Sequence, residues 1–86
     1  MPSEKNIDAV CRRVAALLQQ ERERQNLSMT VLAERSGLSQ ASVSYIERGL
    51  RIPSLDTLLR IAEALDIELG ALIQRASKPT RRTRKA

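Results

Sequence analysis

The chain has 86 residues, a formal net charge of +5, one cysteine and no histidine. Its length suits one small domain, and the single Cys11 without any histidine excludes an internal disulfide and a cysteine-based zinc site. The apolar residues are nearly all Leu, Ile, Val and Ala, with Tyr45 as the only aromatic, which favours a helical bundle. Apolar runs are only a few residues long, so neither a signal sequence nor a membrane span is expected, and a cytoplasmic location is predicted.

The side-chain pairs that most enzymes use are missing from this sequence. With no histidine and one cysteine, the usual acid–base and nucleophilic pairs cannot form, and there is no Gly-rich phosphate loop. Cys11 falls on the apolar side of the first predicted helix and is expected to be a small core residue. The sequence therefore predicts a protein that is not an enzyme, with no catalytic residue, no metal and no cofactor.

Apolar periodicity predicts a long first helix over about residues 6–25. Its side chains at helical spacing form one stripe that should face the core. The members of this stripe are Ile7, Val10, Cys11, Val14, Leu17 and Leu18.

Residues 27–53 predict two short helices, about 29–36 and 40–48, joined by a tight turn. Ser28 and Ser39 can cap them, because a serine hydroxyl accepts the unpaired amides of a first turn. Gly37 suits the left-handed conformation that ends the earlier helix, which costs most residues roughly 1–2 kcal/mol. The small Ala33 lets the later helix cross closely over the earlier one, and Val43 and Ile46 recur on one buried face.

This arrangement is that of a helix-turn-helix, whose second helix can enter the major groove of DNA. An ordinary αα-hairpin is the alternative that any one of these residues would still allow. All of them in register favour the DNA-binding interpretation.

Two further helices are predicted after this motif. Ser54 caps the fourth, over about residues 55–65, and the fifth covers about residues 69–75. Their inward side chains are expected to be Leu55, Leu58, Leu59, Ala62 and Leu65 on the fourth, and Leu69, Leu72 and Ile73 on the fifth.

Several residue groups together resemble a known family: Leu27-Ser28, Leu32-Ala33-Glu34, Ser36-Gly37-Leu38-Ser39-Gln40, Ser44, Ile46-Glu47-Arg48-Gly49 and Pro53-Ser54-Leu55. They resemble the Xre, or phage-repressor (Cro/lambda-repressor-like), helix-turn-helix family. The resemblance covers about residues 14–73 and implies an all-α, five-helix lambda-repressor-like DNA-binding domain. The sequence departs from the family at Met29, where Gln is usual, at Asp66, where Gly or Asn is usual, and at Glu68, where a better helix cap is usual.

The outward face of the third helix is predicted to read DNA bases. The amide of Gln40 matches adenine, and the methyl group of Ala41 suits the methyl group of thymine. Ser44 and Tyr45 lie one turn further along the same face. The resemblance implies that these four positions are the usual base readers.

Phosphate contacts are expected around this helix. Arg48 and Arg51 flank Gly49 at its exit, and helix N-termini favour anions through their dipoles and unpaired amides. For any one of these arginines a solvated surface role is the alternative. The predicted phosphate-contacting positions are Ser28, Met29, Ser39, Ser42, Arg48, Arg51 and Ser54. At Met29 the Gln that is usual in the family helps bind a phosphate and braces the recognition helix.

The resemblance also implies a partly buried ion pair. In the resembling fold the positions of Arg22, late in the first helix, and Glu47, late in the third helix, meet as a salt bridge. Both residue types are suitable here, so a pair that ties the recognition helix to the first helix is expected.

The charge balance separates the domain from its C-terminal end. Residues 1–75 contain ten Lys or Arg and ten Asp or Glu, whereas the remainder contains five cations and no acid. We therefore expect a DNA-binding domain over residues 1–75 and a disordered basic tail over residues 76–86. The tail either contacts DNA phosphates or is merely solvated.

The function predicted from these features is that of a sequence-specific, double-stranded-DNA-binding transcriptional regulator. One such helix reads only a few base pairs, so a homodimer on a palindromic operator is expected, with half-sites about 34–36 Å apart. The Leu69, Leu72 and Ile73 region is the predicted dimer interface, with the first helix as alternative. No ligand-sensing domain is expected. The other candidates are an antitoxin that also neutralises a toxin protein, and an interaction module that does not bind DNA.

Overall fold

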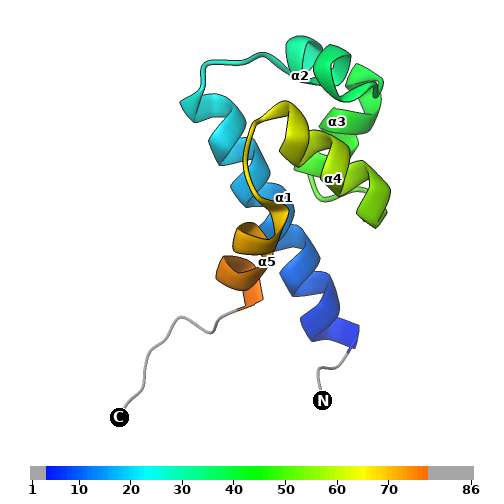
Figure 1. Cartoon of the computed structure of the whole chain (residues 1–86). Helices are drawn as coiled ribbons and strands as arrows, with labels where there is room; N and C mark the ends of the chain where they lie inside the picture. The colour runs from blue at the N-terminus through cyan, green and yellow to red at the C-terminus, as the bar shows by residue number, and fades with distance from the viewer. Residues whose placement is uncertain (1–3, 78–86) are drawn as a thin grey trace.

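Five α-helices joined by short loops make up the computed structural model, which describes residues 4–77 (Figure 1). In chain order they are α1 (Glu4–Arg24), α2 (Met29–Ser36), α3 (Gln40–Glu47), α4 (Leu55–Ala64) and α5 (Leu69–Ser77). The expected all-α, five-helix architecture is confirmed. The fifth helix runs on to Ser77 because Ala76 packs into the core. The part of the expected basic tail from residue 78 onward lies outside the described residues.

Serines cap the N-termini of α2, α3 and α4. Each of Ser28, Ser39 and Ser54 has extended backbone, and its hydroxyl accepts a hydrogen bond from the amide three residues later, at 3.1, 3.0 and 3.2 Å. Gly37 ends α2 in the left-handed conformation, with φ of 73°. These local signals are the ones that the sequence predicted, because capping depends only on neighbouring residues.

α1 is the longest helix of the described chain. It lies against α3 and α5, while α2 lies against α3 and α4 (Figure 1). The apolar side chains between these helices form one buried core: Val14, Ala15, Leu18, Leu32, Ala33, Val43, Ile46, Ile61, Ala62, Leu65, Leu69, Leu72 and Ala76. None of the helices in residues 4–77 has the length and apolarity needed to cross a membrane.

Four side chains that were expected to face the core are exposed instead: Ile7, Leu55, Leu59 and, on α5, Ile73. Ile7 is 51% exposed because the first turns of α1 extend beyond α5 (Figure 1). Leu55 is 62% and Leu59 is 52% exposed, since α4 turns Ile61 and Ala62 inward and leaves its first turn and one flank uncovered. The apolar pattern predicted the helices correctly, but it did not predict how much of each apolar face the neighbouring helices cover.

Two of the three α5 side chains predicted at a dimer interface are buried within the monomer. Leu69 is 6% and Leu72 is 5% exposed, because α5 packs along α1. Leu65, the C-cap of α4, is also buried, with 1% of its surface exposed. Of the three interface residues expected on α5, Ile73 alone keeps substantial exposure, at 37%.

Two turns place residues other than glycine at positive φ. Asn26, after α1, has φ of 60°, and Asp66, after α4, has φ of 59°. Asn and Asp tolerate this region better than most residues. The side-chain Nε2 of Gln25 donates a hydrogen bond of 2.8 Å to the backbone carbonyl of Leu65, which ties the two turns together.

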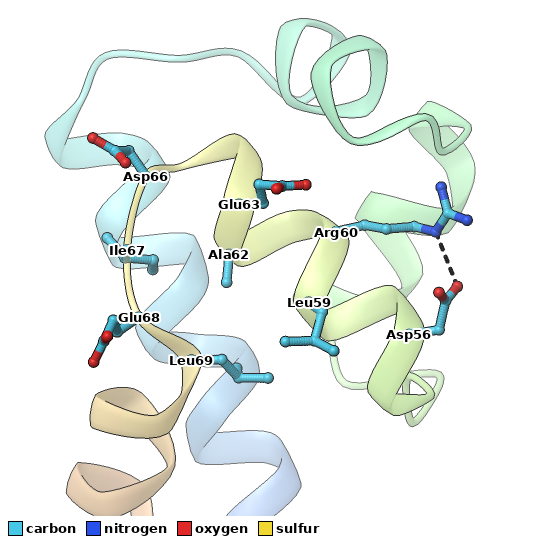
Figure 2. A pocket seen from close by; sticks show the side chains of 9 residues that line it. All are labelled: Asp56, Leu59, Arg60, Ala62, Glu63, Asp66, Ile67, Glu68 and Leu69. Atoms are coloured by element: carbon cyan, nitrogen blue, oxygen red, sulfur yellow. Dashed lines mark hydrogen bonds and ion pairs between the residues drawn. The ribbon is translucent and has the colours of Figure 1, made fainter.

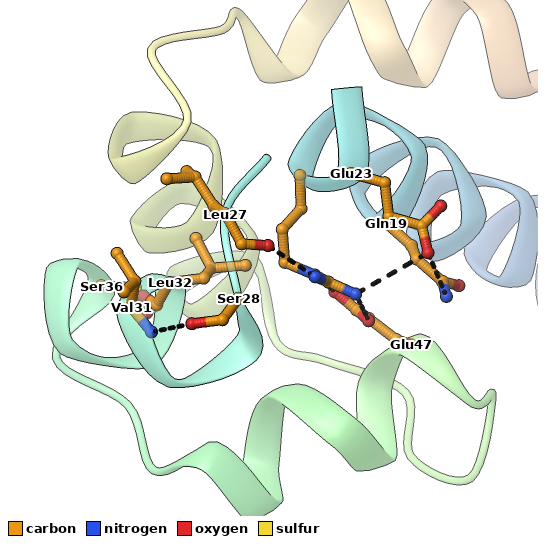
Figure 3. Close-up of polar contacts among 9 residues, drawn as sticks. Gln19, Glu23, Leu27, Ser28, Val31, Leu32, Ser36 and Glu47 are labelled. Atoms are coloured by element: carbon orange, nitrogen blue, oxygen red, sulfur yellow. Dashed lines mark hydrogen bonds and ion pairs between the residues drawn. The ribbon is translucent and has the colours of Figure 1, made fainter. Parts of the chain in front are cut away.

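A buried ion pair joins the recognition helix to α1. The Nε atom of Arg22 donates to one carboxylate oxygen of Glu47 at 2.7 Å, and its Nη2 donates to the other at 2.9 Å (Figure 3). The side chains are only 9% and 4% exposed. Nη1 of Arg22 also donates to the carbonyl of Leu27 at 2.7 Å, so one guanidinium holds α1, α3 and the segment before α2. The hydrogen bonds to Glu47 raise the pKa of Arg22 above its ordinary value.

We predict that Glu47→Ala destabilises the fold by about 3–5 kcal/mol, because it leaves the Arg22 charge buried without its partner. Urea denaturation followed by circular dichroism measures the change. Asp56→Ala, which removes the exposed Asp56–Arg60 pair of α4, is the matched control and should cost only about 0.3–0.5 kcal/mol. Equal losses in the two variants would contradict a special role for the buried pair.

Candidate nucleic-acid interface

The outward face of α3 is polar, uncharged and open. Gln40, Ala41 and Tyr45 are exposed and Ser44 is partly exposed, while Val43 and Ile46 hold the opposite face in the core. The structure therefore gathers the four predicted base readers on one accessible surface. Because the hydrophobic side of α3 is buried, rotation of the helix about its axis would expose the core.

The N-termini of α2, α3 and α4 carry the predicted phosphate-contacting serines. Ser28, Ser39 and Ser54 are exposed, and each uses its hydroxyl as the helix cap described above. The hydroxyl of Ser39 also donates to that of Ser42 at 3.0 Å. A helix N-terminus presents unpaired amides and a partial positive charge, so these ends suit anionic oxygens.

Met29 differs from the other predicted phosphate positions. Its side chain is half-buried and packs against the core. A thioether has no hydrogen to donate, so any phosphate contact at this position is left to the backbone.

Thr30, which the sequence did not single out, contacts the first of the predicted base readers. Its hydroxyl donates a hydrogen bond to Oε1 of Gln40 at 3.1 Å, across the helix-turn-helix. The Nε2 group of Gln40 and the second lone pair of Oε1 remain for a base edge. The Thr30 hydroxyl is thus placed to brace Gln40, one residue after Met29, where the resembling family usually has Gln. The sequence signal for this contact is the Thr30 hydroxyl, which comes directly after the position where the family usually has Gln.

Arginines follow the recognition helix. Arg48 is the C-cap of α3, and both Arg48 and Arg51 are exposed on either side of Gly49, whose φ is 73°. The guanidinium carbon of Arg51 lies 5.3 Å from the centre of the Tyr45 ring. This contact between a predicted phosphate-binding residue and a predicted base reader was not anticipated.

The charge of the surface follows from the buried pair. Glu47 is the only charged residue of α3, and Arg22 neutralises it inside the protein. A carboxylate left uncompensated there would repel phosphates, whereas the pair leaves α3 with no net charge. Residues 4–77 contain no group of three or more His, Cys, Asp or Glu side chains that could hold a metal.

The fold and this surface define a helix-turn-helix protein, and comparison with known proteins agrees. The sequence model of the helix-turn-helix family matches residues 18–72. The chain belongs to this family, in its Xre/Cro-like class of DNA-binding proteins.

Individual relatives are similar over most of the domain. An uncharacterized HTH-type transcriptional regulator of Mycobacterium tuberculosis, MT0491, is 46% identical over 61 residues, which are 71% of this chain and 44% of the relative. The ImmF control region 10 kDa protein of Bacillus phage phi105 is 34% identical over 71% of this chain and 68% of its own length. The chain therefore spans less than half the length of the mycobacterial relative.

A solved structure supports the fold assignment. The crystal structure of the restriction-modification controller protein C.AhdI from Aeromonas hydrophila aligns with a TM-score of 0.67 and 38% identity. The alignment covers 73% of this chain and 94% of that one. The lambda-repressor-like fold expected from the sequence is confirmed.

We predict that Thr30→Val leaves the fold intact, because Thr30 is exposed, but weakens binding to the preferred duplex by about 0.5–1.5 kcal/mol through the loss of one hydrogen bond. The measurement is a titration of a labelled duplex that the protein selects from random-sequence DNA. The control is Thr57→Val, which removes a hydroxyl that is hydrogen-bonded to Ser54, the cap of α4. Its affinity for the same duplex should be closer to that of the wild type than the affinity of Thr30→Val is. If Thr30→Val weakened duplex binding as much in a Gln40→Ala background as in the wild type, the proposed brace between Thr30 and Gln40 would be contradicted.

Proposed function

We propose that this protein is a sequence-specific transcriptional regulator that binds double-stranded DNA as a homodimer on a palindromic operator. The observation that carries the proposal is the neutral, polar, exposed face of α3, bordered by helix N-termini and by Arg48 and Arg51. A face of this kind can exchange hydrogen bonds with base edges while its margins contact the backbone.

Gln40 stands in the first turn of α3, the part of a recognition helix that penetrates deepest into the major groove. Its amide can accept from N6 and donate to N7 of one adenine. The Thr30 hydroxyl limits the amide to fewer orientations, which favours one base over the others. Ala41, Ser44 and Tyr45 complete the proposed reading surface.

The proposed dimer uses the open groove between α4 and the turn before α5. Leu59 and Ile67 lie on its walls with the edge of the buried Leu69 (Figure 2). A two-fold axis here would cover apolar surface that the monomer leaves exposed. The carboxylates of Glu63, Asp66 and Glu68 line the same groove, so their mutual repulsion across the axis should weaken the dimer at low salt.

We predict that Gln40→Ala lowers affinity for the operator by about 1–3 kcal/mol and relaxes the preference at one base pair in each half-site. Binding to nonspecific DNA should stay nearly unchanged, because no phosphate contact is lost. The experiment first selects duplexes from genomic fragments with the full chain, then titrates a matched set of operator variants at fixed salt.

The matched control is Arg48→Ala. This change should weaken all duplexes by similar factors and reduce the slope of log affinity against log salt by about 0.9 for one lost phosphate contact. Recovery of no preferred sequence in the selection would overturn the proposed function. If Gln40→Ala kept the wild-type order of preference, Gln40 would not be a base reader.

For the dimer, we predict that Leu59→Asp yields a monomer in sedimentation at micromolar concentration, since a charge would enter the apolar contact twice. The wild-type dimer should tighten as salt rises, opposite to DNA binding. Ile7→Asp is the control, because Ile7 is 51% exposed on α1, away from the groove. A dimer lost only in the Ile7 variant would place the interface on α1 instead.

A further inference from the structure

The side chain of Arg51 lies over the only aromatic ring in the sequence. The 5.3 Å between its Cζ atom and the ring centre of Tyr45 is within the range of a cation–π contact. Tyr45 remains 41% exposed, so the contact leaves much of this side chain open to a ligand. A long exposed arginine and an exposed tyrosine would otherwise occupy many rotamers.

The backbone brings these two residues together. After α3 the amide of Leu50 donates to the carbonyl of Tyr45 itself at 2.9 Å, and the amide of Gly49 donates to the carbonyl of Ile46 at 3.1 Å. Gly49 adopts the positive φ that this double closure requires. The chain therefore turns back directly after the helix, and Arg51 follows a residue that is tied to Tyr45.

We propose that Arg51 is a positioning residue for DNA recognition, which holds the ring of Tyr45 in the orientation that reads a base. This inference rests on the proposed function and deepens it. It assigns to Arg51 a part in sequence discrimination, in addition to the phosphate contact expected at that position. Tyr45 touches the base, and Arg51 acts through it.

Two physical effects support this role. A ring that is already oriented loses less conformational freedom when DNA binds, so the correct base gains affinity through preorganisation. The cation–π contact uses the charge of Arg51 and not its N–H groups, which donate no hydrogen bond within the described part of the chain. The guanidinium can thus contact a DNA phosphate and the Tyr45 ring at the same time. This links the position of the protein along the DNA backbone to the orientation of the base reader.

Arg48 provides a matched control. It is also exposed and lies nearer to Tyr45 in sequence, but among residues 4–77 only Arg51 makes a cation–π contact. A general effect of positive charge at the end of α3 would act equally through both arginines.

The first test examines the protein without DNA. Because the sequence contains no Phe, Trp or His, the ring current of Tyr45 is the only aromatic one in the protein. NMR should show the Arg51 side-chain protons displaced upfield in the wild type and returned to ordinary positions in Tyr45→Leu, with Arg48 unaffected. The absence of a ring-current shift on Arg51 would overturn the proposal.

The second test is a double-mutant cycle on the selected operator and on its single-base variants. Arg51→Gln should weaken operator binding about 2- to 5-fold more in the wild-type background than in the Tyr45→Leu background. The preference at the base pair next to Tyr45 should relax in Arg51→Gln as it does in Tyr45→Leu. Arg48→Gln should cost the same factor in both backgrounds and leave the order of preference unchanged.

The outcomes separate this inference from the function on which it rests. If the wild type selects no duplex, the proposed function fails, and the positioning role falls with it. If the wild type binds its operator and Arg51→Gln costs the same factor in both backgrounds, the function stands and the positioning role is wrong. In that case Arg51 contacts phosphate alone.

Discussion

The orientation of α3 depends on the ion pair between Arg22 and Glu47. A helix of eight residues has little stability alone, so its direction must come from contacts with the rest of the molecule. Apolar packing of Val43 and Ile46 is non-directional and leaves some freedom to slide. Two short hydrogen bonds between a planar guanidinium and a carboxylate allow the helix much less freedom to slide, because such bonds form only within a small range of distances and angles.

The same pair decides the electrostatics of the DNA-facing surface. Burial of an ion pair is seldom a large net gain in stability, but its directional hydrogen bonds fix how the two helices are placed. It anchors the C-terminal end of α3 to α1 and removes the one negative charge of that helix. The surface that remains is neutral along α3 and positive at its exit, which suits contact with bases in the middle and phosphates at the margin.

Two side chains from outside α3 hold proposed base readers at its two ends. Near the start, the Thr30 hydroxyl of α2 bonds to Gln40, and near the end Arg51 lies over Tyr45. Both contacts are exposed and individually weak. They act on orientation rather than on overall stability, so variants at these positions are expected to fold normally and to differ in recognition. At Met29, where the resembling family usually has Gln, the side chain packs against the core.

The sequence by itself determined the helices, their serine caps, the glycine turn of the helix-turn-helix and the outward face of α3. These features depend on residues within one or two turns of each other, and the motif spacing identified the family. The Arg22–Glu47 pair was also expected, but from the resemblance, since nothing local links residues 25 positions apart. Tertiary structure alone decided which apolar residues are covered. Leu69 and Leu72 are buried because α5 lies along α1, whereas Leu55 and Leu59 are exposed because no helix of the described chain covers that side of α4. The contact between Thr30 and Gln40 belongs to this second class, because it requires two helices to approach in space, which a linear pattern does not encode.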